Sequence, residues 1–162
     1  FSGTADEPAW NAVNDGVMGG VSRGGAKLIA GSLHFRGVLS LENNGGFASV
    51  RSLPRTLGLQ AGDTLVSRVR GDGREYQLNL YTARQMRALS YRAPVPTRAG
   101  EWIEVAIPMD RFEATSFGEV VRGAGAVDPR SVMSISFLLA EKRPGPFVLE
   151  LAWVRVLRGQ GR

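Results

Sequence analysis

The side chains that most often carry catalytic or metal chemistry are scarce in this chain. It contains one histidine, His34, and no cysteine. A serine-based triad needs a positioned base, and transition-metal sites use several His or Cys ligands. The lack of cysteine also excludes disulfides and thiolate nucleophiles. We therefore predict no catalytic residues, no cofactor and no metal site, and a protein that is not an enzyme.

Carboxylates are the remaining route to chemistry. The 15 Asp and Glu residues are dispersed along the chain, and none of them forms an EF-hand type of loop. A glycoside hydrolase would need two carboxyl groups roughly 5–9.5 Å apart in a cleft, which this dispersal disfavours. A structural calcium ion near Asp6, Glu7 and Asp15 stays open as an alternative.

Polar side chains on the predicted strands suggest a binding face. Some short segments alternate apolar with polar residues, and their polar positions carry planar hydrogen-bonding groups. If these strands are neighbours, the groups form one patch suited to a sugar or a peptide. The alternative is an ordinary solvated sheet face. The candidate residues of this sheet-face site are Arg68, Arg70, Gln77, Asn79, Tyr81 and Glu104.

The elements that must position these residues are β-strands. Apolar and polar residues alternate with a period of two, which predicts half-buried strands. Two further segments are apolar on both faces, as expected for central strands. Short helical turns are expected near 110–113 and after Pro129. The half-buried strands are predicted at 32–41, 46–51, 64–70, 76–81 and 102–108, and the central ones at 132–140 and 147–156.

Glycine and proline punctuate these strands, with 21 and 8 residues in the chain. Many short strands with turn signals between them, and no long amphipathic helix, favour an antiparallel β-sandwich or jelly roll. The composition is that of an ordinary globular protein, and 162 residues suit one domain. We therefore predict an all-β fold with a single domain over 1–162 and a core at about 10–156.

Charge and hydropathy limit the partners. The net charge is +5, and arginine makes up 18 of the 20 basic residues. The arginines are scattered and no basic run with interleaved aromatics occurs, so we expect no nucleic-acid partner. No apolar run approaches the roughly 20 residues of a transmembrane helix.

The location is left open by the sequence. The arginine-rich composition is typical of a bacterial protein. The expected compartments are therefore the bacterial cytoplasm or the periphery of a membrane. The chain begins at Phe1 rather than methionine, so we expect a trimmed or processed form that lacks its targeting segment.

Four motifs follow one another in the chain: Trp10, NDGVMGGVS at 14–22, ENNGGFASVR at 42–51 and RGDGREY at 70–76. In this order they resemble the complex I intermediate-associated protein family, named for an assembly factor of mitochondrial respiratory complex I. Later pieces also fit, so that the resemblance covers about 10–156: Trp102, Ile107-Pro108, Arg111-Phe112, and Gly145-Pro146-Phe147 with Leu149-Glu150.

The resemblance implies a galactose-binding-domain-like jelly roll without established catalytic machinery. It also implies a non-catalytic module that binds protein partners, respiratory complex I subunits or assembly intermediates among them, while NADH:ubiquinone oxidoreductase is assembled. A jelly-roll carbohydrate-binding module is the alternative.

The motif residues also have local structural interpretations. Asp72 and Arg74 are expected to pair across a tight turn and fix Tyr76, and Ser22 to tie its glycine-rich loop to a strand. Loops on a rigid sandwich are also where recognition residues gather, so both roles stay open. The predicted binding residues of the motif loops are Asp15, Met18, Ser22, Asn43, Asn44, Arg51, Asp72, Arg74 and Tyr76.

Overall fold

The computed structural model describes residues 10–14, 20–82 and 89–159 as two packed sheets. A seven-stranded sheet has the order β1-β4-β11-β6-β7-β9-β10, and a five-stranded sheet has the order β2-β3-β12-β5-β8. The strands are β1 Trp10–Asn14, β2 Arg23–Ile29, β3 Ser32–Leu39, β4 Ala48–Ser52, β5 Thr64–Arg70, β6 Glu75–Thr82, β7 Leu89–Pro96, β8 Trp102–Pro108, β9 Glu113–Ser116, β10 Glu119–Val120, β11 Val132–Leu139 and β12 Gly145–Leu157.

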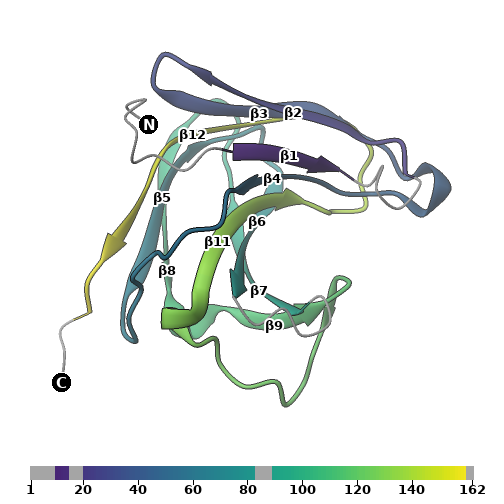
Figure 1. The fold of residues 1–162 in the computed structure, drawn as a ribbon. Coiled ribbons are helices and arrows are strands. Elements are labelled where there is room, and N and C mark those ends of the chain that lie inside the picture. The colour runs from purple at the N-terminus through teal and green to yellow at the C-terminus, as the bar shows by residue number, and fades with distance from the viewer. Residues whose placement is uncertain (1–9, 15–19, 83–88, 160–162) are drawn as a thin grey trace.

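The named strands in the described residues pair antiparallel, which confirms the predicted all-β sandwich. Figure 1 shows the seven-stranded sheet curving from β1 to β9, with the five-stranded sheet along its convex side. The segments predicted as central strands, β11 and β12, have neighbours on both sides. Single 3-10 turns at Met109–Arg111 and Pro129–Ser131 match the expected helical positions. A third, Glu42–Asn44, follows β3.

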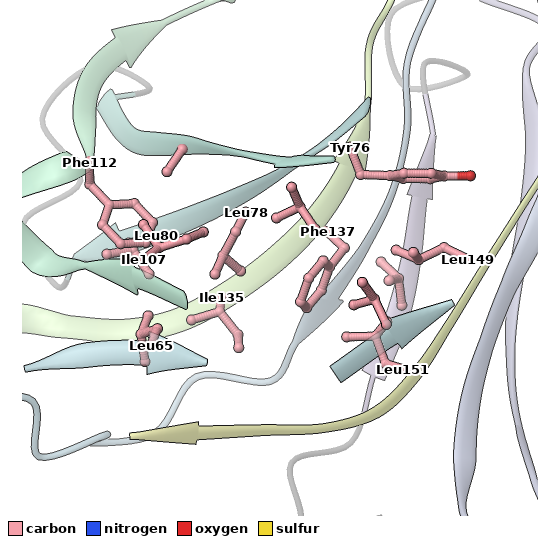
Figure 2. Packing of buried hydrophobic residues seen from close by; sticks show 14 of the residues in the cluster. Leu65, Tyr76, Leu78, Leu80, Ile107, Phe112, Ile135, Phe137, Leu149 and Leu151 are labelled. Atoms are coloured by element: carbon pink, nitrogen blue, oxygen red, sulfur yellow. The ribbon is translucent and has the colours of Figure 1, made fainter. Parts of the chain in front are cut away.

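The core lies between the sheets and is built by the alternation that the sequence shows. On β6, Tyr76, Leu78 and Leu80 point inward and are fully buried. Figure 2 shows Leu80 beside Phe112 and Ile107, Leu78 near Phe137 of β11, and Tyr76 on the side of Leu149 of β12. Removing a fully buried phenylalanine such as Phe137 typically costs about 3–5 kcal/mol. The inward positions are thus committed to packing, and any ligand must be met by the outward ones or by loops.

No helix in the described ranges is both long and apolar enough to span a bilayer.

The turn between β9 and β10 holds an aromatic residue in a strained conformation. Phe117 has φ of 49° and Gly118 of 87°, and Ser116 pairs with Glu119 across the turn. A two-residue turn with two positive φ angles favours Asn at its first position, whereas Phe117 is 82% exposed and gains little packing there. Replacing Phe117 with Asn is therefore expected to raise the free energy of unfolding by about 0.5–1 kcal/mol. Urea denaturation measures this, and an unchanged or lower stability would contradict it.

Candidate functional site

A row of polar residues crosses the outer, concave face of the seven-stranded sheet. Each member is the direct register partner of the next on the neighbouring strand, so the side chains share one face. Neighbouring strands lie about 4.8 Å apart, so the row extends roughly 24 Å across six strands. This polar row consists of Asn11, Arg51, Ser136, Asn79, Arg92 and Glu113.

Tyr81 lies beside the row and is held by its members. The guanidinium of Arg51 stacks over the Tyr81 ring, with its central carbon 3.6 Å from the ring centroid. Arg51 Nε also donates to Ser134 Oγ at 3.1 Å. The Tyr81 hydroxyl shares a hydrogen bond with Ser136 Oγ at 3.0 Å. These contacts fix Arg51 and Tyr81 in one geometry before any ligand arrives.

Arg92 carries a charge in a partly dehydrated position. Burial lowers the pKa of its guanidinium from the ordinary value, because desolvation disfavours the charged form. Its Nε donates to Asn79 Oδ1 at 3.3 Å, and Asn79 is 3% exposed. The ion pairs formed within the described ranges do not include Arg92. The row thus presents a guanidinium that is available to an acceptor on a ligand.

The chemistry of this face is hydrogen bonding. Ser134 and Ser136 are at most 1% exposed, and they buttress the arginine and tyrosine instead of facing a base. Over the described ranges, no three His, Cys, Asp or Glu side chains come together in a way that could hold a metal ion. The arrangement is suited to recognising a polar ligand that lies across the strands.

The stacked pair gives a direct test of this geometry. We expect Arg51→Met and Tyr81→Leu to be non-additive, with a coupling free energy of about 0.5–1 kcal/mol, because each variant removes the same cation–π contact. Denaturation of the wild type, both single variants and the double variant measures the coupling. The pair Arg98→Met and Tyr81→Leu serves as the control, since Arg98 is 73% exposed and pairs with Glu101 instead. Additive losses for Arg51 and Tyr81 would show that the stacking contributes nothing.

Three of the motif residues meet in a second cluster, in which Arg74 and Tyr76 are buried and the carboxylates are partly exposed. The guanidinium of Arg74 donates to Glu141 Oε1 at 3.0 Å, and to the carbonyl oxygens of Arg143 at 2.6 Å and Pro146 at 3.1 Å. Asp72 Oδ2 lies 3.1 Å from the Tyr76 hydroxyl and accepts from the Val148 amide at 2.9 Å. We call Asp72, Arg74, Tyr76 and Glu141 the Arg74 cluster.

The Arg74 cluster is directed inward. Arg74 is 6% exposed and Tyr76 is fully buried. Burial, followed by the nearby Asp72 carboxylate, raises the pKa of Tyr76 far above its ordinary value, so its hydroxyl remains a donor. The cluster joins the start of β6 to the start of β12 and to the loop between β11 and β12. Its geometry is that of a structural support for these elements.

The other motif residues are spread over different places. Ser22 Oγ donates to the Ser40 carbonyl at 3.0 Å and accepts from the Ser40 amide at 2.9 Å, so it ties the segment before β2 to the end of β3. Asn43 has φ of 54° within the 3-10 turn Glu42–Asn44, which also contains Asn44. Asp15 and Met18 lie outside the described residues. Arg51 is the motif residue that joins the polar row.

The predicted sheet-face patch is divided between two sheets. Gln77, Asn79 and Tyr81 lie on β6 of the seven-stranded sheet, whereas Arg68, Arg70 and Glu104 lie on β5 and β8 of the five-stranded sheet. Both sets point outward, because the residues between them on each strand fill the core. The prediction of one shared patch is therefore wrong. The chain crosses between the sheets at the turn from β5 to β6, which alternation within each strand cannot reveal.

Five contributors to the concave face were not identified from the sequence: Asn11, Arg92, Glu113, Ser134 and Ser136. Arg92 lies on β7, which was not predicted because Pro94 and Pro96 interrupt its pattern. Ser134 and Ser136 lie within a segment that reads as apolar on both faces. Their alternation with Ile135 and Phe137 is the signal that could have placed them outward.

The fold is shared with carbohydrate-binding modules. A family 11 module from Clostridium thermocellum, solved in complex with a β-1,3-1,4-mixed-linked tetrasaccharide, is similar with a TM-score of 0.68 at 14% sequence identity. The match covers 93% of this chain and 91% of that one. At this identity the likeness shows the fold alone.

Two relatives are closer in sequence. The chain is 36% identical over 100 residues to the mitochondrial Complex I intermediate-associated protein 30 of Mus musculus, and 36% identical over 96 residues to that of Drosophila melanogaster. The alignments cover 58% and 56% of this chain, but only 30% and 32% of those proteins. The family model for Complex I intermediate-associated protein 30 matches residues 1–151. The chain therefore belongs to the Complex I intermediate-associated protein 30 family.

Proposed function

We propose that this chain is a protein-binding module that assists the assembly of respiratory complex I without catalysing a reaction. The observation that carries the proposal is the family match over residues 1–151, nearly the whole chain. The two relatives named for complex I intermediates share 36% of their aligned residues with it.

The concave face is the surface we assign to partner binding. It offers polar side chains on rigid strands, two arginines among them, and several are already held by hydrogen bonds. Such a face loses little conformational entropy when a partner binds. A protein segment can supply backbone and side-chain acceptors to Arg51 and Arg92, which are partly exposed. Binding without catalysis agrees with the hydrogen-bonding chemistry of the row.

Carbohydrate binding is the alternative, and the aromatic residues do not favour it. Sugar sites usually stack a ring on an open aromatic face. One face of Tyr81 is covered by Arg51, and Tyr91 is 7% exposed within the core. Trp102 lies on β8, in the other sheet. The concave face therefore offers a sugar hydrogen bonds, but of these three rings only Tyr81 lies there with some exposure, and Arg51 already covers one of its faces.

The experiment is affinity capture of the tagged protein from membranes of the organism that encodes it, read by mass spectrometry. Enrichment of subunits or assembly intermediates of NADH:ubiquinone oxidoreductase is the expected result. The double variant Arg51→Met and Arg92→Met should lose this enrichment, whereas the control Arg98→Met, at an exposed position, should keep it. Recovery of no respiratory-complex protein would contradict the proposal. Binding on a glycan array would then support the carbohydrate alternative.

A further inference from the structure

The outer face of the five-stranded sheet carries an unusual set of side chains. Two of the three tryptophans, Trp102 and Trp153, lie there instead of in the core, and both are partly exposed. Large aromatic side chains are ordinarily buried, and their exposure on a rigid sheet is typical of binding surfaces. Trp102 is on β8 and Trp153 is on β12.

Arginines stack on both indole rings. The guanidinium carbons of Arg70 and Arg68 lie 4.9 Å and 5.9 Å from the centroid of Trp102. That of Arg155 lies 4.1 Å from the centroid of Trp153. A guanidinium that lies over an aromatic ring can still donate from its N–H edge to a planar acceptor. We call Arg68, Arg70, Trp102, Trp153 and Arg155 the arginine–tryptophan face.

The strand register extends this face across the whole sheet. One row of successive register partners crosses all five strands and consists of Lys27, His34, Glu150, Arg70 and Trp102. Trp153, Arg68 and Glu104 form a second row beside it. Arg36, two residues from His34, points to the same side.

Positive charge dominates, but carboxylates stand within the face. The described residues of the two rows, taken together with Arg36 and Arg155, include five lysine or arginine side chains and two carboxylates. One of these carboxylates, Glu150, is 12% exposed and is already engaged by Arg70 and His34. The hydrogen bond from Arg70 holds the pKa of Glu150 below its ordinary value, so it stays ionised. The other carboxylate, Glu104, lies 4.0 Å from Arg68 in a solvent-exposed ion pair, with Arg68 45% exposed. Arg155 is exposed.

We propose that the arginine–tryptophan face is a second docking surface, and that it binds an acidic segment of a protein partner. Arginine and tryptophan are the residue types that contribute most to protein interfaces, and arginine pairs bidentately with carboxylates. Glu104 and Glu150 interrupt the positive charge of the face. An acidic protein segment whose carboxylates are spaced by neutral residues therefore matches the face better than a dense polyphosphate or an anionic bilayer does. The inference rests on the proposed protein-binding function and adds a surface opposite the polar row.

The test is an NMR titration of the ¹⁵N-labelled protein with a short synthetic peptide of glutamate, aspartate and serine around a single leucine. The indole N–H signals of Trp102 and Trp153 are expected to shift and to report weaker binding as salt is added. The chemical shift of the Trp10 indole signal should stay unchanged, because Trp10 packs against the core from β1 of the other sheet. The variant Arg68→Glu with Arg155→Glu should bind the peptide roughly tenfold more weakly, and the exposed control Arg98→Glu should bind as the wild type does.

Two further probes decide the chemistry of the partner. The proposal is overturned if the peptide leaves both indole signals unmoved, or if its Gln/Asn counterpart moves them equally. It is also overturned if phosphatidylserine vesicles or duplex DNA bind this face more tightly than the peptide does. Because the titration uses no respiratory protein, its failure is distinct from failure of the capture experiment.

Discussion

Replacing Arg74 with methionine is expected to lower the free energy of unfolding by about 3–5 kcal/mol, which is a large part of the stability of a typical domain. Methionine keeps much of the side-chain length but removes every hydrogen-bond donor of the side chain. Glu141 would lose a charge-assisted bond, and the carbonyls of Arg143 and Pro146 would lose their hydrogen bonds from the guanidinium. With Arg74 only 6% exposed, water cannot easily replace it.

Chemical denaturation of Arg74→Met measures this loss, with Arg98→Met as a matched control at an exposed position. Arg74→Lys should recover only part of the stability, because one ammonium cannot reach acceptors spread around a planar fork. A loss below about 1 kcal/mol for Arg74→Met would show that the cluster is not a structural support. It would return Asp72, Arg74 and Tyr76 to consideration as binding residues.

The second large effect is expected for Gly37→Ala, with a loss of about 3 kcal/mol or more. Gly37 on β3 pairs with Gly24 on β2. A Cβ atom at Gly37 would lie 1.8 Å from the carbonyl oxygen of Arg23 and 2.6 Å from Gly24 Cα. Both atoms belong to the backbone of β2, so no side chain can move aside and the strand itself must shift.

Gly25→Ala is the control for this clash, because a Cβ atom there would meet nothing within 4 Å. Hydrogen exchange of the β2 amides should become faster in Gly37→Ala and stay near the wild-type rate in Gly25→Ala. Equal stability of the two variants would contradict the close packing of β2 on β3.

The strands that were predictable are those with a clean local pattern. The predicted ranges 64–70 and 102–108 coincide with β5 and β8, where alternate residues enter the core. By contrast, β7 was hidden by Pro94 and Pro96. These prolines are tolerated because β9 pairs with β7 only along Leu89–Arg92. Among the described strands, the proline end of β7 therefore has no hydrogen-bonded neighbour on the side away from β6.

The site was predictable only in part, because it depends on which strands are neighbours. Asn79 and Tyr81 were identified as outward on β6, and Arg51 was identified from a motif, but no local pattern shows that β11 lies between β4 and β6. That topology brings Arg51 onto the Tyr81 ring. The same topology separates Arg68 and Arg70 from Asn79, although only a short turn joins their strands.

The most direct test of the proposed role is the amount of fully assembled NADH:ubiquinone oxidoreductase in cells of the source organism that lack this protein. Native gel electrophoresis of their membranes, read by NADH dehydrogenase staining, measures it. We predict that the assembled complex falls and that partial assemblies accumulate, with recovery when the wild-type chain is restored. An unchanged level of the assembled complex would contradict a role in its assembly.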